Sequence, residues 1–241
     1  MSSSSQSGFG SRLENSKFLI SVIKTYSQYN PSLPLIQISI YEPYVNSVEA
    51  AMSPFSLAKE TFDLLDNDVR AYFESIVSVC RSVRNVIIEL FGRDSGKYAD
   101  YNELIDKITG DNITKNSYKR NHSESEENPD EDFQSVAQVD RGSRLANFAA
   151  LVEMLKNEPL YDPQKNELKV VSLQELHDQA SSANQNLATA YGTYTTQRAV
   201  ILPLFDGPEG LTVRAERAKA HLRSVYGPQS PELKALTGKT Y

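Results

Sequence analysis

Three histidines, one cysteine and a small group of arginines are the side chains of this sequence that could do chemistry. A helical metal site needs a second histidine or a carboxylate three or four residues from the first ligand. His177 and His221 have no such neighbour, and His122 lies in an acidic stretch. Cys80 is the single cysteine, which excludes an internal disulfide and a cysteine-based metal cluster. We therefore expect no metal and no cofactor.

The motifs of covalent catalysis and phosphate transfer are also missing. No Gly-x-Ser-x-Gly turn occurs to expose a nucleophilic serine. The glycine-containing stretch 206–210 is acidic and is not followed by the Lys-Ser or Lys-Thr pair of a phosphate-binding loop. Cys80 falls on an apolar helix face, which predicts a core position. We predict no catalytic residue, and a protein that is not an enzyme.

Five arginines remain as candidate interaction residues. Arg214, Arg217 and Arg223 make the segment 213–226 a basic amphipathic helix, which could face phosphate or nucleic acid. Arg12 and Arg144 occupy equivalent places in the two halves of the chain. We interpret them as pairing with carboxylates or capping backbone near a helix start, with ligand binding as the second interpretation.

Charge and composition set the broad class of the protein. The net charge of −6 is concentrated in residues 111–140, where 8 acidic and 3 basic side chains leave −5. Neither half has the basic excess typical of nucleic-acid binding. The N-terminal residues show no basic stretch followed by an apolar run, and no apolar run is long enough to span a bilayer. We expect a cytoplasmic protein without a membrane segment.

An internal repeat organises the chain. The hexapeptide Gly-Ser-Arg-Leu-Glu-Asn at 10–15 recurs as Gly-Ser-Arg-Leu-Ala-Asn at 142–147, and the window 10–31 holds 9 identities in 22 positions at this offset of 132. Chance would give about one or two. Three residues inserted within 206–210 then change the offset to 135. We predict two copies, residues 1–110 and 142–241, joined by an acidic, disordered linker, residues 111–141.

The repeat includes an apolar helical face that occurs in both copies. Apolar residues at steps of 4, 3, 4 and 3 recur 135 positions later with different side chains. The first set is Ile76, Cys80, Val83, Ile87 and Leu90, and the second is Leu211, Ala215, Ala218, Leu222 and Val225. Since helix 76–91 carries further apolar residues and helix 211–226 carries charged ones, we expect the first to be central and the second peripheral.

Each copy reads as three helices with a short tail. A first helix (about 12–29) ends at a Tyr-x-Pro turn, a long second helix follows, and the third helix ends at Gly92 or Gly227 before a serine-capped tail at Ser95 or Ser230. Pro54 predicts a kink or restart in the second helix of the first copy. The fold class predicted is all-α, a helical bundle from two tandem copies of a three-helix unit with long helices.

The Gly-Ser-Arg-Leu-x-Asn repeat, the Tyr-x-Pro turn and the Phe/Tyr-Gly-x-x-Ser tail together resemble a group of uncharacterised, duplicated helical proteins common in Bacteroidota. The resemblance covers most of residues 10–108 and 142–238. It implies the two-copy architecture and implies no activity, cofactor or catalytic residue.

These features favour a non-catalytic scaffold, adaptor or assembly subunit that engages a protein partner or another copy of itself. One alternative is a helical sensor of small molecules, which requires a cavity between helices lined by tyrosines. A second alternative is a nucleic-acid-associated protein that uses the basic helix 213–226.

Overall fold

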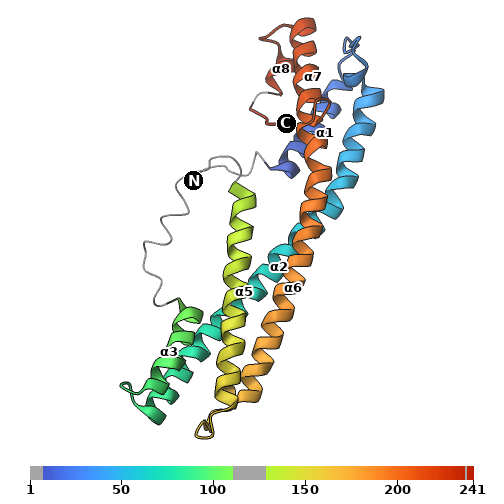
Figure 1. The fold of residues 1–241 in the computed structure, drawn as a ribbon. Helices are drawn as coiled ribbons and strands as arrows, with labels where there is room; N and C mark the ends of the chain where they lie inside the picture. The colour runs from blue at the N-terminus through green and yellow to red at the C-terminus, as the bar shows by residue number, and fades with distance from the viewer. Residues whose placement is uncertain (1–7, 111–128, 237) are drawn as a thin grey trace. The chain divides into compact units, whose positions relative to one another are not determined.

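The computed structural model describes residues 8–110, 129–236 and 238–241, and for 129–140 it describes the backbone only. Every regular element in these residues is helical, which confirms the all-α class (Figure 1). The helices are α1 (Phe9–Ile23), α2 (Ile38–Phe91), α3 (Gly96–Thr109), α5 (Pro129–Lys156), α6 (Val170–Asp206), α7 (Leu211–Tyr226) and α8 (Pro231–Lys234), with 3₁₀ turns η2 (Pro34–Ile36) and η3 (Asn166–Leu168). No described helix is long and apolar enough to cross a membrane.

The helix α2 is one uninterrupted element of 54 residues. It continues through Pro43 and Pro54, so the expected restart at Pro54 does not occur. No glycine or proline lies between residues 55 and 91, and extending a helix is far easier than starting one. The predicted second and third helices of the first copy are therefore a single helix. In the second copy the inserted stretch 206–210 separates α6 from α7.

The structure describes only the C-terminal end of the acidic linker predicted at 111–141. Residues 111–128 lie outside the described residues. The helix α5 begins at Pro129 and therefore includes residues 129–141 of the predicted linker. No proline follows between 130 and 156, which allows the helix of the second copy to extend toward its N-terminus.

The chain divides into two compact units that differ from the two sequence copies. Unit 1 comprises residues 1–62 and 190–241, and unit 2 comprises residues 63–189. Residues of each predicted copy therefore belong to both units. Unit 1 combines the first helix of the first copy with the third helix of the second copy, and unit 2 combines α5 with the C-terminal part of α2.

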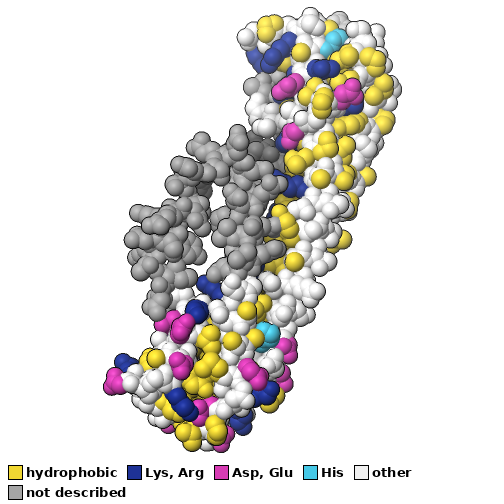
Figure 2. Space-filling view, in the orientation of Figure 1, with side chains coloured by type: hydrophobic (Ala, Val, Ile, Leu, Met, Phe, Trp, Pro, Cys, Tyr) yellow, Lys and Arg dark blue, Asp and Glu magenta, His cyan; other side chains and the backbone are white. Residues whose placement is uncertain are grey.

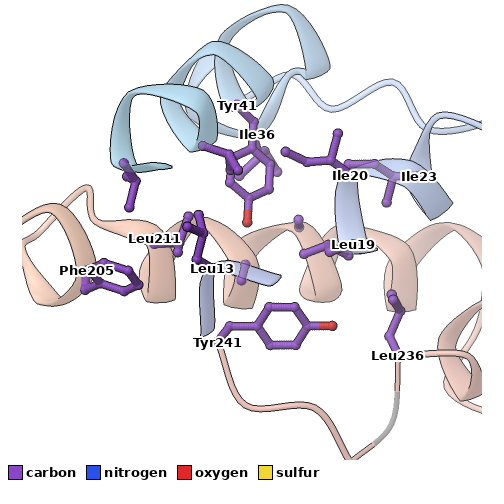
Figure 3. Close-up of a cluster of buried hydrophobic side chains, with 14 of the residues drawn as sticks. Leu13, Leu19, Ile20, Ile23, Ile36, Tyr41, Phe205, Leu211, Leu236 and Tyr241 are labelled. Carbon is purple, nitrogen blue, oxygen red and sulfur yellow. The ribbon is translucent and has the colours of Figure 1, made fainter. Parts of the chain in front are cut away.

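The core of unit 1 is built from segments far apart in the chain (Figure 3). Helix α1 packs against α7, and α7 also contacts η2. Buried side chains come from α1, the start of α2, the end of α6, α7 and the C-terminal residues. The largest fully buried ones include Leu19, Ile23, Tyr41 and Phe205.

The core of unit 2 lies between α2, α3, α5 and the start of α6. Helix α3 makes its main contacts with α5. The fully buried side chains include Ile76, Val83, Ile87, Ile105, Ile108, Phe148, Leu151, Leu155 and Leu173. This core is apolar throughout its centre, so hydrophobic burial is its main source of stability.

The repeated helical face is buried equally in the two units. Ile76 is 1% exposed and Cys80, Val83 and Ile87 are 0% exposed. Their counterparts Leu211, Ala215, Ala218 and Leu222 are all 0% exposed. The expectation that helix 76–91 is central and helix 211–226 peripheral is therefore wrong. A single stripe is enough to seat either helix, because each lies in a different unit with its own core.

Candidate functional site

Arg12 is held by side chains within unit 1. Its guanidinium forms an ion pair with Asp206 and donates a hydrogen bond to the hydroxyl of Thr212. It also lies 5.1 Å from the centre of the Phe205 ring. The side chain is only 12% exposed. The carboxylate pairing expected for Arg12 is confirmed, and the group ties α1 to the end of α6 and to α7.

Arg214 is buried, with 6% of its surface exposed. Its Nε donates to the carbonyl of Glu209 and its Nη1 to the carbonyl of Leu35, both at 2.8 Å. The guanidinium carbon lies 3.8 Å from the centre of the Tyr44 ring. Such contacts satisfy a buried cation without a carboxylate. Arg214 therefore faces the core of unit 1 and not the surface that an interaction role requires.

The other basic side chains of α7 are either exposed to solvent or in contact with neighbouring residues. Arg217 and Arg223 are exposed. Lys219 lies 3.9 Å from the centre of the Tyr241 ring and donates to the carbonyl of Lys239. Desolvation by burial, together with the nearby charge of Arg223, lowers the pKa of Lys219. Figure 2 shows basic side chains interspersed with acidic and hydrophobic ones on the face it displays, so α7 presents no broad basic surface there.

Arg144 lies in a groove of unit 2 between α2 and α5. The groove has a volume of about 470 Å³, within the range of small-molecule sites. Arg141 and Arg144 are three residues apart on α5 and so share a face. The lining residues from α2 are Arg70, Phe73, Glu74, Val77, Ser78 and Arg81.

The α2 wall of the groove is a single helix face. Its lining residues are separated by alternate steps of three and one along the sequence. Residues three or four positions apart in this series therefore lie on the same face of the helix. Phe73 turns toward the core and is 7% exposed, whereas Arg70, Glu74 and Arg81 are exposed. The wall therefore presents cations above an apolar floor.

Asp66 links the two walls of the groove. It forms an ion pair with Arg70, at 2.6 Å between Nη2 and Oδ2, and accepts a hydrogen bond from Arg141 at 2.9 Å. The carboxylate of Asp66 is 17% exposed and the side chain of Arg141 is 21% exposed. The pair is therefore only partly accessible to water, and its charge-assisted hydrogen bond joins α5 to α2.

The histidines and the cysteine take structural positions where they are described. His177 lies beside Asp178, with 3.0 Å between Nδ1 and Oδ1, and the ring of His221 packs edge-on against Tyr29 at 5.2 Å. Cys80 is buried, and burial raises the pKa of its thiol to about 12. Among the described residues no group of three or more His, Cys, Asp or Glu could hold a metal ion. His122 lies outside the described residues.

The tyrosines that a sensor cavity would need are packed against other rings. Tyr191 and Tyr194 lie within 6 Å of Phe62, and Tyr194 stacks on it with an interplanar angle of 13°. Phe55 lies 5.8 Å from Tyr194. This cluster belongs to unit 1, while the groove of unit 2 has no tyrosine in its lining.

Sequence reasoning found one of the four arginines of the groove. Arg144 was singled out because it recurs, but Arg70, Arg81 and Arg141 were not. Their spacing on α2 is visible in the sequence, since Arg70, Val77 and Arg81 fall on one helix face. The pairing of α2 with α5 has no local signal, because it joins residues about 60 to 75 positions apart.

The comparisons with known proteins give no relative. No family model, no curated protein and no solved structure matches the chain. The resemblance to duplicated helical proteins of Bacteroidota therefore stays a prediction.

Proposed function

We propose that this chain is a non-catalytic helical scaffold that binds a protein partner or a second copy of itself. The observation that carries the proposal is a pair of apolar side chains left exposed beside each 3₁₀ turn. In unit 2, Leu160 is 59% exposed and Val171 is 68% exposed, before and after η3. In unit 1, Leu33 is 39% exposed and Ile40 is 42% exposed around η2.

Exposed leucines scattered singly need no explanation. Here, however, two large apolar residues near the 3₁₀ turn lie in water in both units, although they do not occupy corresponding positions of the repeat. Exposed apolar surface of this kind is typical of protein interaction sites. The turns themselves are firmly held, which suits a docking surface because little ordering entropy is then lost on binding.

The two turns are fixed by the same tyrosine bond. Tyr29 donates its hydroxyl to the carbonyl of Ile36 at 2.8 Å, and Tyr161 donates to the carbonyl of Leu168 at 2.7 Å. Both hydroxyls lie 132 positions apart, as do the two acceptors. Burial raises the pKa of both tyrosines. This matched bond supports the proposal that the scaffold arose by duplication.

The helix ends support the same proposal. Gly92 and Gly227 both adopt positive φ, at 72° and 88°, a conformation that strongly favours glycine. Three residues later Ser95 and Ser230 accept hydrogen bonds from the backbone N–H of Tyr98 and Leu233. Under duplication, α1 and α5 correspond, and α7 corresponds to the C-terminal part of α2. The copies then exchange their third helices between the units.

The scaffold proposal is tested with the full-length tagged chain. Leu160→Ser with Val171→Ser removes the exposed apolar pair of unit 2, and Leu57→Ser is the matched control because Leu57 is 65% exposed but is distant from both turns in the sequence. Native mass spectrometry measures self-association, and quantitative affinity purification measures partners. We expect one stoichiometric partner, or a dimer of the chain, retained by the control and weakened about tenfold or more in the double variant.

A monomeric chain that recovers the same proteins in the same amounts with and without the two substitutions would contradict the scaffold proposal. Circular dichroism of each variant confirms that the helices remain formed.

We further propose a cytoplasmic location, on the basis of the single cysteine and the absence of a helix suited to the membrane in the described residues.

The alternative of nucleic-acid binding through helix 213–226 is weakened by Arg214, which donates to backbone carbonyls in the core. Only Arg217 and Arg223 of the three arginines there are exposed.

A further inference from the structure

Side-chain hydrogen bonds hold residues 239–241 on unit 1. These residues belong to no helix, yet each of their three backbone carbonyls accepts a hydrogen bond from a side chain of α1 or α7. The donor and acceptor pairs are Lys219 to Lys239 at 3.3 Å, Asn15 to Thr240 at 2.7 Å and Thr212 to Tyr241 at 3.0 Å. Peptide-binding sites work in this way, because bonds to the main chain give affinity while side-chain pockets give specificity.

The ring of Tyr241 anchors this segment. Only 6% of Tyr241 is exposed, and it belongs to the same buried cluster as Leu13 and Leu19 (Figure 3). The ammonium group of Lys219 lies 3.9 Å from the centre of the ring, a contact that favours an aromatic side chain there. The hydroxyl of Tyr241 is buried and has no hydrogen-bond partner among the described residues. The contacts therefore recognise the ring and not the hydroxyl.

A second contact between a cation and a ring involves the residue two positions earlier. The ammonium group of Lys239 lies 4.3 Å from the centre of the Phe18 ring on α1. Thr240, between Lys239 and Tyr241, is exposed. The contacts therefore favour a lysine followed two positions later by an aromatic residue.

The groups that hold the segment are already positioned by the fold. Asn15 and Phe18 belong to α1, Thr212 and Lys219 belong to α7, and these two helices pack against each other. Thr212 also accepts a hydrogen bond from Arg12, which leaves its hydroxyl proton for the carbonyl of residue 241. A site built in advance loses little ordering entropy when it binds a peptide.

Residues 239–241 can detach while the helices stay formed. Gly238 precedes them with a φ of 77°, a conformation that strongly favours glycine and so places a hinge at this point. Short segments outside helices open at a lower free energy than packed helices do. A peptide that offers the same groups can then compete for the same donors.

We propose that Asn15, Phe18, Thr212 and Lys219 form a peptide-recognition site for a segment of a partner protein in which an aromatic residue follows a lysine by two positions. Residues 239–241 occupy this site in the free chain and act as an internal competitor. The proposal goes beyond the scaffold role and does not depend on the exposed apolar residues near η2 and η3.

The test is an NMR titration of the isotope-labelled full chain with the acetylated and amidated peptide Gly-Lys-Thr-Tyr. Tyr241→Ala removes the anchoring ring of the internal competitor and keeps the four site residues. We expect this variant to bind the peptide with a Kd at or below about 1 mM. The wild-type chain should bind it at least about tenfold more weakly, because its own segment competes at a high effective concentration.

A second variant releases the segment without changing a core side chain. Gly238→Val strains the hinge, since φ at this position is positive. It should bind the peptide more tightly than the wild-type chain does. This variant gives the answer even if Tyr241→Ala does not fold, and thermal unfolding checks both variants.

Peptide variants and a matched pair of substitutions identify the recognised groups. Gly-Lys-Thr-Phe should bind as tightly as the tyrosine peptide, whereas Gly-Lys-Thr-Ala should cause no change in the spectrum. Asn15→Ala, added to either released variant, should weaken peptide binding about three- to tenfold through the loss of one hydrogen bond. Asn147→Ala is the matched control, because Asn147 lies 132 positions later, on α5 in unit 2. It should leave the affinity unchanged.

Three results would overturn the proposal. The first is no response of either released variant to the tyrosine peptide well above about 1 mM. The second is equally tight binding by the wild-type chain and the released variants, because residues 239–241 would then not occupy the site. The third is binding of the alanine peptide as tightly as the tyrosine peptide, or an equal loss in Asn15→Ala and Asn147→Ala, because the contacts described above would then not be the ones that bind.

Discussion

Ile87 and Leu222 occupy matched positions on the repeated helical face, and replacing each by alanine tests whether both helices are core elements. Both side chains are 0% exposed. Each substitution deletes three carbon atoms from a packed site, which costs about 2–5 kcal/mol through lost burial and the cavity left behind. Natural domains are stable by only about 5–15 kcal/mol, so either change removes a large share of the total.

Leu90→Ala and Val225→Ala are the matched controls. They continue the same stripe, but Leu90 is half-buried and Val225 is 36% exposed. Less apolar surface is lost there, so each control should cost less than its buried neighbour. Urea unfolding followed by far-UV circular dichroism gives the free energies of unfolding and the slope that reports exposed surface.

The two units could unfold together or in sequence, and both cases are informative. In a single transition Ile87→Ala and Leu222→Ala lower the midpoint by similar amounts. In two transitions the first substitution shifts the step of unit 2 and the second shifts the step of unit 1. A loss of about 2–5 kcal/mol at Ile87 with less than about 1 kcal/mol at Leu222 would refute the equal burial of the two helices.

Three further predictions concern single groups. The Cys80 thiol is fully buried with its pKa raised to about 12, so a thiol reagent at pH near 8 should label it far more slowly in native protein than in denaturant, and equal rates would contradict its packing. The hydrogen bond from Lys97 lowers the pKa of the Glu158 carboxyl. This bond therefore adds stability that is present above the ordinary carboxyl pKa and is lost as the pH falls through the lowered pKa of Glu158. Lys97→Met should flatten the decline of the unfolding free energy between about pH 5 and 3, and an unchanged pH profile would argue against the bond. Arg214→Ala should cost about 1–3 kcal/mol in urea unfolding because two backbone carbonyls lose their donor, and a loss within about 0.5 kcal/mol, as expected for an exposed arginine, would place Arg214 at the surface.

The helical class and most helix ends were predictable from local patterns. Gly92 and Gly227 end their helices with positive φ, and Ser95 and Ser230 cap the next ones. These features depend on one residue and its near neighbours. The continuity of α2 through Pro54 was not predicted, because a proline costs one backbone hydrogen bond and a long amphipathic helix can absorb that loss through its packing.

The burial of Arg214 was predictable from its position in the sequence, but the prediction for this helix relied on its charge instead. The residue lies three positions after Leu211 and four before Ala218, in phase with the buried stripe. An arginine in that phase needs internal acceptors, and the carbonyls of Leu35 and Glu209 provide them. The acceptor in η2 comes from 179 residues away, so the partner itself could not be read from the sequence.

The arginine groove was the least predictable feature. Arg141 and Arg144 approach Arg70 and Arg81 only because α5 packs beside α2 within unit 2. That pairing joins segments far apart in the chain, which no local pattern encodes. The repeat alone suggested that each copy would fold as its own unit.

The central claim is that two copies of one helical unit exchange their third helices, and an experimental structure of the full chain tests it most directly. The decisive measurement is the superposition of unit 1 on unit 2 within that structure. The account predicts that 9–23 aligns on 141–155 and, in the same operation, that 211–226 aligns on 76–91, with all helices running in the same directions. A structure in which 9–23 packs beside 76–91, or in which no single operation aligns both pairs, would contradict it.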